Sequence, residues 1–260
     1  MVTTGIDVGH RTSKLVMLND RKIIDQRVVE NSDESTVIAE RILGAGLQAV
    51  DIRREDIGFT VATGAMGKGL KFVDMYRTSM ACLARGVYEL FPQARTIIDL
   101  GGETCTVFKM GEGGGILDMQ ANDKCAAGTG IFFEAMAKLL GVSLDDMGRL
   151  ATEGTKNFEI SSMCVVFAEQ EVISHAHENP DISAADLAAS LHASIAARVA
   201  GLAKRLTVEK DVVLTGGCAK NPGYVKYMQE ILKMDVKVPQ DPQGVMAFGA
   251  ALIAYEKGRK

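Results

Sequence analysis

The chain has 260 residues, of which 47% are apolar, and a formal net charge of −4. This length suits one large domain or two of about 130 residues. The mixed charges, the absence of Trp and an aromatic content of 5% offer neither a nucleic-acid surface nor a basic patch for an anionic membrane. No apolar run is long enough to span a membrane, and the first residues enter a strand pattern without a leader sequence, so we expect a cytoplasmic protein.

The first third of the chain begins with "GIDVGHRTSKLVML", in which an apolar strand ends at Asp7-Val8-Gly9. A second strand is predicted over Lys14–Leu18, which makes the opening a β-hairpin. The following patterns predict a helix over Ser35–Ala49, a strand over Gly58–Thr63 and a helix over Ser79–Phe91.

The opening pattern returns at Ile97 as "IIDLGGETCTVFKM", with Asp99-Leu100-Gly101 followed by a strand over Thr106–Met110. Asp7 and Asp99 are 92 residues apart, and their flanks match. Such an internal repeat predicts an α/β protein with two similar lobes that face each other across a cleft. An ordinary strand-ending turn is the alternative for either Asp-x-Gly motif taken alone.

The second half contains two cysteine segments, "NDKCAAGTGIFFEAM" and "ISSMCVVFAEQEVIS", each of which predicts a turn followed by a helix. The remaining patterns predict a helix over Ala184–Arg205, a strand over Asp211–Gly217, a helix over Tyr224–Leu232 and a C-terminal helix. We expect residues 1–93 and the C-terminal helix, 244–260, to form the first lobe, and residues 94–243 to form the second.

The glycine turns after the two Asp-x-Gly strands suit phosphate groups, because backbone amides can approach an anion where no Cβ intervenes. The predicted first phosphate turn comprises Gly9, His10, Arg11, Thr12, Ser13 and Lys14, and the predicted second phosphate turn comprises Gly101, Gly102, Glu103 and Thr104. Asp7 and Asp99 are predicted to hold a hydrated Mg²⁺, which prefers oxygen ligands and keeps several waters. Glu103 is a weaker candidate for positioning the attacking water.

A third glycine turn, "TGGCAKN" at residues 215–221, is predicted to approach a nucleoside. We name it the nucleoside turn and expect contacts from Gly216, Gly217 and Asn221, with Gln243 lining the same site. The chain has no G-x-x-x-x-G-K-[ST] motif, so a P-loop is not expected.

These motifs together resemble the actin/sugar-kinase/Hsp70 superfamily. Within it, "GIDVG", "DLGGE", "NDKCAAGTG", "ISSMCVVFAEQEVIS" and "GAALIAY" resemble the activator (component A) of 2-hydroxyacyl-CoA dehydratases, a group related to the benzoyl-CoA reductase ATPase subunits. The resemblance covers nearly the whole chain and implies two actin-like (ribonuclease H-like) lobes around a nucleotide cleft, with ATP/ADP and Mg²⁺ as ligands. One departure is Gly9-His10-Arg11, where such activators usually carry Gly-Ser-Thr. Hydroxyl contacts to phosphate are then expected to shift to Thr12 or Ser13.

Cys125 and Cys164 each stand directly before a predicted helix. Their placement alone favours small buried packing residues, which free cysteines commonly are. The resemblance instead implies metal ligands. A [4Fe–4S] cluster needs four thiolates, which a two-fold homodimer supplies from two cysteines per chain, so one cluster per dimer is expected. Cys82, Cys105 and Cys218 are expected to be packing residues.

The resemblance implies an ATP-dependent reductive activator, that is, an ATPase that drives low-potential electron transfer to a partner iron–sulfur dehydratase or reductase. It also implies an upstream electron donor such as ferredoxin or flavodoxin. A small-molecule kinase of the same superfamily and a nucleotide switch without a redox role are the alternatives, and the sequence does not identify the partner's substrate.

Overall fold

The computed structural model describes residues 1–122, 129–156, 158–160 and 164–259. The chain divides into two compact units. The first unit comprises Met1–Gln93, Gly111–Gly115 and Gly244–Lys260, and the second comprises Ala94–Met110 and Ile116–Gln243. Each unit holds a mixed five-stranded sheet.

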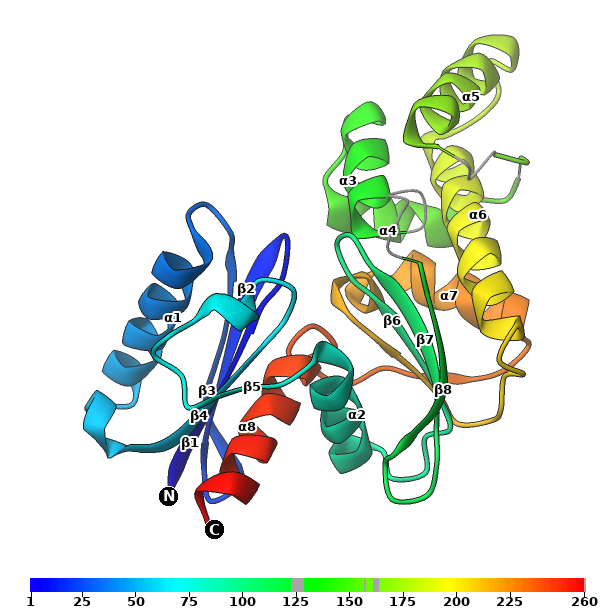
Figure 1. Ribbon diagram of the computed structural model, residues 1–260. Coiled ribbons are helices and arrows are strands. Elements are labelled where there is room, and N and C mark those ends of the chain that lie inside the picture. Colours follow the sequence, from blue (N-terminus) through cyan, green and yellow to red (C-terminus); the bar gives the residue numbers. More distant parts are fainter. Residues whose placement is uncertain (123–128, 157, 161–163, 260) are drawn as a thin grey trace. The chain divides into compact units, whose positions relative to one another are not determined.

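The sheet of the first unit has the strand order β3-β2-β1-β4-β5 (Figure 1). Its strands are β1 (Val2–Val8), β2 (Thr12–Asn19), β3 (Lys22–Glu30), β4 (Ile57–Thr63) and β5 (Met75–Tyr76). Its helices are α1 (Ser35–Ala49), α2 (Ser79–Leu90) and α8 (Val245–Gly258), with short 3₁₀ turns at Arg54–Asp56 and Gly67–Gly69.

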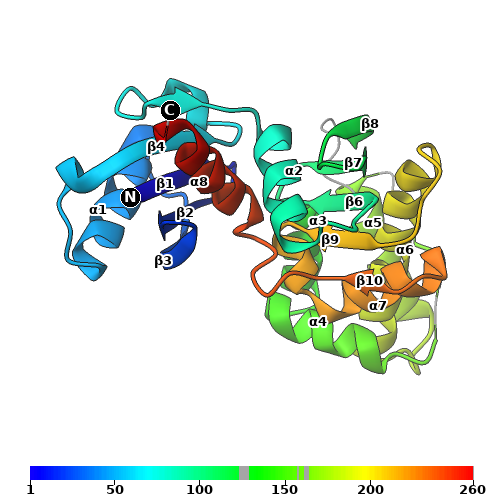
Figure 2. The same ribbon diagram turned by 90° about the horizontal axis from the view of Figure 1, so that it is seen from below.

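Helices α1 and α8 cover opposite faces of the first sheet, as Figures 1 and 2 show together. Successive residues of a strand point to opposite faces. On β2, Leu15 and Met17 pack with α1 residues, whereas Val16 and Leu18 pack with Ala251 and its neighbours in α8. The C-terminal helix therefore completes the core of the unit in which the chain begins.

The sheet of the second unit has the order β10-β9-β6-β7-β8. Its strands are β6 (Thr96–Leu100), β7 (Cys105–Met110), β8 (Ile116–Asn122), β9 (Val212–Thr215) and β10 (Val236–Lys237). Its helices are α3 (Gly130–Leu139), α4 (Leu144–Glu153), α5 (Val165–Glu178), α6 (Ala184–Lys204) and α7 (Pro222–Leu232), with a 3₁₀ turn at Gly217–Lys220.

The two sheets repeat one connectivity. β1 pairs antiparallel with β2 and parallel with β4, just as β6 pairs antiparallel with β7 and parallel with β9. The repeated Asp-x-Gly motif is thus the start of a repeated fold. The predicted helices agree with α1, α2, α6, α7 and α8 to within two residues at each end, whereas the third strand of each sheet, β3 or β8, was not predicted. Both strands lie at a sheet edge with largely exposed or half-buried residues, so an apolar pattern does not mark them.

None of the helices in the described ranges combines the length and the apolar character that crossing a bilayer requires.

Candidate nucleotide and cluster site

The first phosphate turn, residues 9–14, is closed by its own backbone. β1 and β2 pair Asp7 with Lys14 and Val8 with Ser13, and the Gly9 N–H donates to the Thr12 carbonyl at 3.1 Å. His10 and Arg11 are exposed at the tip. The tip therefore presents backbone and a cationic side chain outward, which suits an anionic ligand.

Asn31, the residue after β3, holds this turn from the side. Its Nδ2 donates to the carbonyls of Gly9 at 2.8 Å and His10 at 3.2 Å. Its Oδ1 accepts from the Ser13 hydroxyl at 2.8 Å, and its backbone N–H donates to the Arg11 carbonyl at 3.0 Å. Because the Ser13 side chain is fully buried and donates inward, Thr12 is the remaining hydroxyl candidate for a phosphate.

Asp7 is buried at the end of β1 and forms an ion pair with Lys14, with Nζ 3.1 Å from Oδ2. Gly64 follows β4, has φ +89°, and lies so close that a Cβ there would collide with Asp7 Oδ1 and the Val8 carbonyl. Only glycine fits both the backbone conformation and the space. The carboxylate is thus fixed by a cation on one side and a bare backbone on the other.

The second phosphate turn, residues 101–104, is tied to helix α3. The Gly101 N–H donates to the Thr104 carbonyl at 2.8 Å. The first amides of α3 donate back to the turn, from Gly130 to the Gly101 carbonyl at 2.8 Å and from Ile131 to the Gly102 carbonyl at 2.9 Å. Thr129, the N-cap residue of α3, makes no side-chain capping bond to the helix. The carbonyls of the turn instead accept from the first helical amides, which have no acceptor within the helix. A displacement of the turn must therefore displace the start of α3.

Asp99 is buried at the end of β6 and accepts a hydrogen bond from the Thr215 hydroxyl at 2.8 Å. Thr215 ends β9, and Gly216 follows with φ +85°. A Cβ on Gly216 would collide with the Leu100 carbonyl. Each unit therefore has a positive-φ glycine directly after the neighbouring parallel strand, packed against the backbone of the residue that follows the aspartate.

The nucleoside turn and Gln243 lie together in the second unit. The Lys220 Nζ donates to Gln243 Oε1 at 2.7 Å, and a Cβ on Gly217 would meet Gln243 Nε2 at an ordinary 3.6 Å. A flat backbone surface beside an amide side chain suits a planar base.

The side chain of Asn221 is directed inward. Its Oδ1 accepts from the Tyr224 N–H at 3.0 Å, as the cap of α7, and lies 3.1 Å from Nε2 of His192. Burial lowers the pKa of His192 to about 4, so the imidazole stays neutral at physiological pH. Asn221 thus anchors the turn to α6 and α7, and a nucleoside contact from it remains a prediction.

The described cysteines fall into two groups. Cys82, Cys105 and Cys218 are buried, and burial raises the pKa of the Cys82 thiol to about 11, that of Cys105 to about 12, and that of Cys218 further still. Cys164 is half-exposed at the N-cap of α5, with φ −153°. Its thiol can thus be reached from solvent, unlike the three buried thiols. Cys125 lies outside the described residues.

Among the residues that the structure describes, no three His, Cys, Asp or Glu side chains gather as a metal site. Glu103 is exposed on the second phosphate turn.

Sequence reasoning missed Asn31, Gly64, Thr215 and the amides of α3. A usable sequence pattern exists for two of them: each half has a Thr-Gly pair directly after an apolar strand, at Thr63-Gly64 and at Thr215-Gly216. The role of Asn31 depends on hydrogen bonds to residues of the first phosphate turn that lie at least 18 positions earlier in the chain, and no local sequence pattern predicts such bonds.

The chain is similar over its full length to known proteins. The chain is 43% identical over 260 residues to the activator of lactoyl-CoA dehydratase from Anaerotignum propionicum, covering all of both chains. Among solved structures, it matches an activator of the 2-hydroxyisocaproyl-CoA dehydratase from Clostridium difficile with bound ADPNP, with a TM-score of 0.94, 38% identity and coverage of 100% of this chain and 96% of that one.

A glucokinase of the ROK family from Streptomyces griseus, in complex with glucose and AMPPNP, shares the fold alone, with a TM-score of 0.59, 13% identity and coverage of 98% of this chain and 100% of that one. The α/β fold with two actin-like units is thereby confirmed. The model of the BadF/BadG/BcrA/BcrD ATPase family matches residues 4–254, and the chain belongs to this ATPase family.

Proposed function

We propose that this protein is an ATP-dependent reductive activator that couples ATP hydrolysis to low-potential electron transfer to a partner iron–sulfur dehydratase or reductase. The observation that carries the proposal is the full-length identity of 43% to an activator of lactoyl-CoA dehydratase. The ADPNP bound by a solved relative of 38% identity supports ATP and ADP as ligands. A ferredoxin or flavodoxin is the proposed electron donor.

In this proposal the two phosphate turns bind the phosphates of Mg-ATP through backbone amides. Asp7 and Asp99 hold the hydrated Mg²⁺. They fit this role because both carboxylates are buried at strand ends and are oriented by Lys14 and Thr215 respectively, so little reorganisation accompanies metal binding. Glu103 positions the attacking water, and Gly216, Gly217 and Gln243 contact the nucleoside.

Cys125 and Cys164 are the proposed ligands of one [4Fe–4S] cluster, shared by the two chains of a homodimer. Cys164 fits because it is half-exposed at a helix N-cap, unlike the three buried cysteines of the described ranges. When bound, such a cluster supplies one-electron transfer. The role of the chain is to hold the cluster through the thiolates of Cys125 and Cys164 and to change their position.

The contact between the second phosphate turn and α3 is the proposed means of coupling. The Cys125 segment directly precedes α3 in the sequence, and the first amides of α3 donate to the carbonyls of the turn. ATP biases only those states that bind it differently. A turn whose position depends on the γ-phosphate would change the position of α3, and with it the cluster ligand that precedes the helix.

The test is anaerobic purification of the wild type and of Cys125→Ser and Cys164→Ser, with Cys82→Ser as the matched control. We expect about four irons per wild-type dimer and a brown colour, loss of both in the first two variants, and retention in the control. Each serine variant should still bind ADP, because the nucleotide residues are unchanged.

A wild type that is colourless and free of iron would contradict the redox role and favour the kinase or the nucleotide switch. Iron that persists in Cys125→Ser or Cys164→Ser would contradict the assigned ligands. In a separate arm, Asp99→Asn should lower the rate of ATP hydrolysis at least tenfold, and an unchanged rate would contradict the role of this carboxylate.

A further inference from the structure

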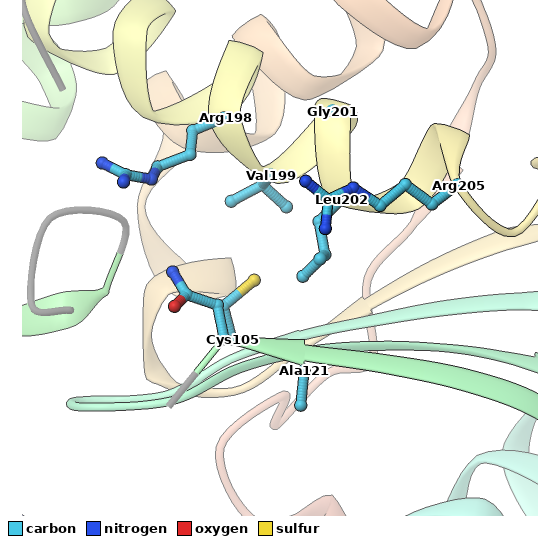
Figure 3. A pocket seen from close by; sticks show the side chains of 8 residues that line it. Cys105, Ala121, Arg198, Val199, Gly201, Leu202 and Arg205 are labelled. Atoms are coloured by element: carbon cyan, nitrogen blue, oxygen red, sulfur yellow. The ribbon is translucent and has the colours of Figure 1, made fainter. Parts of the chain in front are cut away.

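A cavity of about 350 Å³ lies in the second unit between α6 and the strands β7 and β8 (Figure 3). Figure 3 shows Arg198 on α6 and Arg205, which directly follows this helix, above Cys105 and Ala121 of the sheet. Ligand pockets typically measure about 300–1,000 Å³, so the cavity has the size of a small-molecule site.

The cavity lies on the opposite face of the sheet from the proposed magnesium ligand. Asp99 pairs with Thr106, and Leu100 pairs with Cys105. Because side chains alternate along each strand, Cys105 and Asp99 point to opposite faces. A ligand in this cavity would therefore occupy a site separate from that of Asp99.

Two guanidinium groups line the cavity without a carboxylate partner. Neither Arg198 nor Arg205 makes an ion pair with a residue of the described ranges, and Nη1 of Arg198 is shielded from solvent with no hydrogen-bond partner. Other arginines of the chain do pair with Asp or Glu, namely Arg21, Arg27, Arg41, Arg53, Arg54, Arg85 and Arg149. A shielded guanidinium N–H without an acceptor is costly, so Arg198 favours an acceptor in the cavity. Arg205 is exposed and adds a second positive charge to the lining.

The rest of the lining also suits an anion. Burial raises the pKa of the Cys105 thiol to about 12, so the thiol is neutral and the lining carries two positive charges and no negative one. Asn122 adds an amide, and Val199 and Leu202 add an apolar wall. Gly201 lies on α6 between the two arginines in sequence. A Cβ there would meet nothing within 4 Å, which leaves the rim open.

We propose that this cavity binds a small oxyanion, either a phosphate or a short-chain carboxylate, through the guanidinium groups of Arg198 and Arg205. Arginine is suited to both, because its planar donors match the oxygens of a carboxylate or a phosphate. Asn122 donates a further hydrogen bond, and the apolar wall receives the alkyl part of a carboxylate. Binding is reversible and involves no covalent step.

The test is calorimetric titration of inorganic phosphate, and separately of butanoate, into the full chain purified anaerobically and saturated with Mg-ADPNP. This non-hydrolysable ATP analogue fills the positions of all three phosphates and so keeps inorganic phosphate from the phosphate turns. The variants are Arg198→Met and Arg205→Met, which keep an unbranched apolar stem but remove the charged guanidinium group, and Gly201→Leu, which keeps both charges but blocks the rim. Arg53→Gln, at an exposed arginine paired with Asp56, is the matched control.

We expect the wild type and Arg53→Gln to bind one anion per chain with equal affinity, and the other three variants to bind it at least tenfold more weakly. ADP affinity should be the same in all five proteins, which shows that they are folded. Tighter binding of phosphate identifies an inorganic or phosphoryl ligand, and tighter binding of butanoate identifies a carboxylate. The proposal is overturned if the wild type binds neither anion, or if Arg198→Met and Gly201→Leu bind as the wild type does.

Discussion

Asn31 offers the sharpest test of the first phosphate turn, because one side chain makes three hydrogen bonds that define the shape of the turn. Asn31→Ala removes the bonds to the Gly9 and His10 carbonyls and the acceptor of the buried Ser13 hydroxyl. Each such bond contributes about 1 kcal/mol net, and a buried hydroxyl left without a partner costs about 1–3 kcal/mol. The native shape of the turn should therefore lose about 2–4 kcal/mol relative to alternatives.

Part of this loss must be recovered when a nucleotide binds, because the phosphate needs the turn in its native shape. If about 2 kcal/mol appears in binding, ADP affinity falls about 30-fold. Calorimetric titration of ADP into wild type and Asn31→Ala measures this directly. Asn19→Ala is the matched control, since Asn19 lies at the far end of β2 and accepts only an exposed bond from the N-terminal amine at 3.3 Å, among the contacts described. An Asn31→Ala protein that is folded and binds ADP within twofold of wild type would refute the reasoning.

Three further predictions concern the second unit. Gly216→Ala should lower the free energy of unfolding, measured in urea, by about 2–4 kcal/mol, because the residue has a positive φ and a Cβ there would collide with the Leu100 carbonyl. Gly201→Ala, at an open helical position, should instead raise the free energy of unfolding by about 0.5–1 kcal/mol. Equal effects of the two substitutions would contradict the steric argument. Thr215→Val should lower the free energy of unfolding by about 1–3 kcal/mol and slow ATP hydrolysis, because Asp99 loses a buried hydrogen-bond donor. Thr63→Val should cost less, because among the described residues the buried Thr63 hydroxyl has only the Cys82 thiol, a weak hydrogen-bonding group, beside it. A larger loss of stability for Thr63→Val would count against the role of Thr215. The pKa of the Asp186 carboxyl is held well below its usual value by hydrogen bonds from the Lys156 amide, the Ser183 hydroxyl and the Thr155 amide. The ionised carboxylate therefore stabilises the fold above about pH 4, and this contribution is lost as the pH falls below that value. The difference in unfolding free energy between wild type and Asp186→Asn should shrink from pH 7 to pH 3, and a constant difference would rule out the carboxylate charge as its source.

The sequence alone predicts the repeated hairpins because their determinants are local. Each needs an apolar strand, an aspartate and a glycine that lets the chain turn, and these stand within a few residues of one another at Asp7–Gly9 and Asp99–Gly101. The C-terminal helix was likewise expected to belong with the first lobe, and α8 lies in the first unit.

The direction of individual side chains could not be predicted, because it depends on partners distant in the sequence. Asn221 stands in a glycine turn that suits a nucleoside, yet its amide is turned toward His192, 29 residues earlier. The hydroxyl of Ser13 is similarly taken by Asn31. The attachment of α3 to the second phosphate turn has no sequence pattern either, since it joins backbone groups, which carry no residue identity.

The position of α8 in the first unit also affects the order in which the two units can fold during translation. The ribosome completes β1, β2 and β4 early, but Val16, Leu18 and Val61 pack against residues of α8, which is made only after the whole second unit. The second unit, in contrast, has all of its residues by position 243. The second unit can therefore fold first during translation, while the first unit keeps an apolar sheet face uncovered until α8 has been made. A truncation before residue 245 would leave that face without its cover and make the nascent first unit a substrate for chaperones.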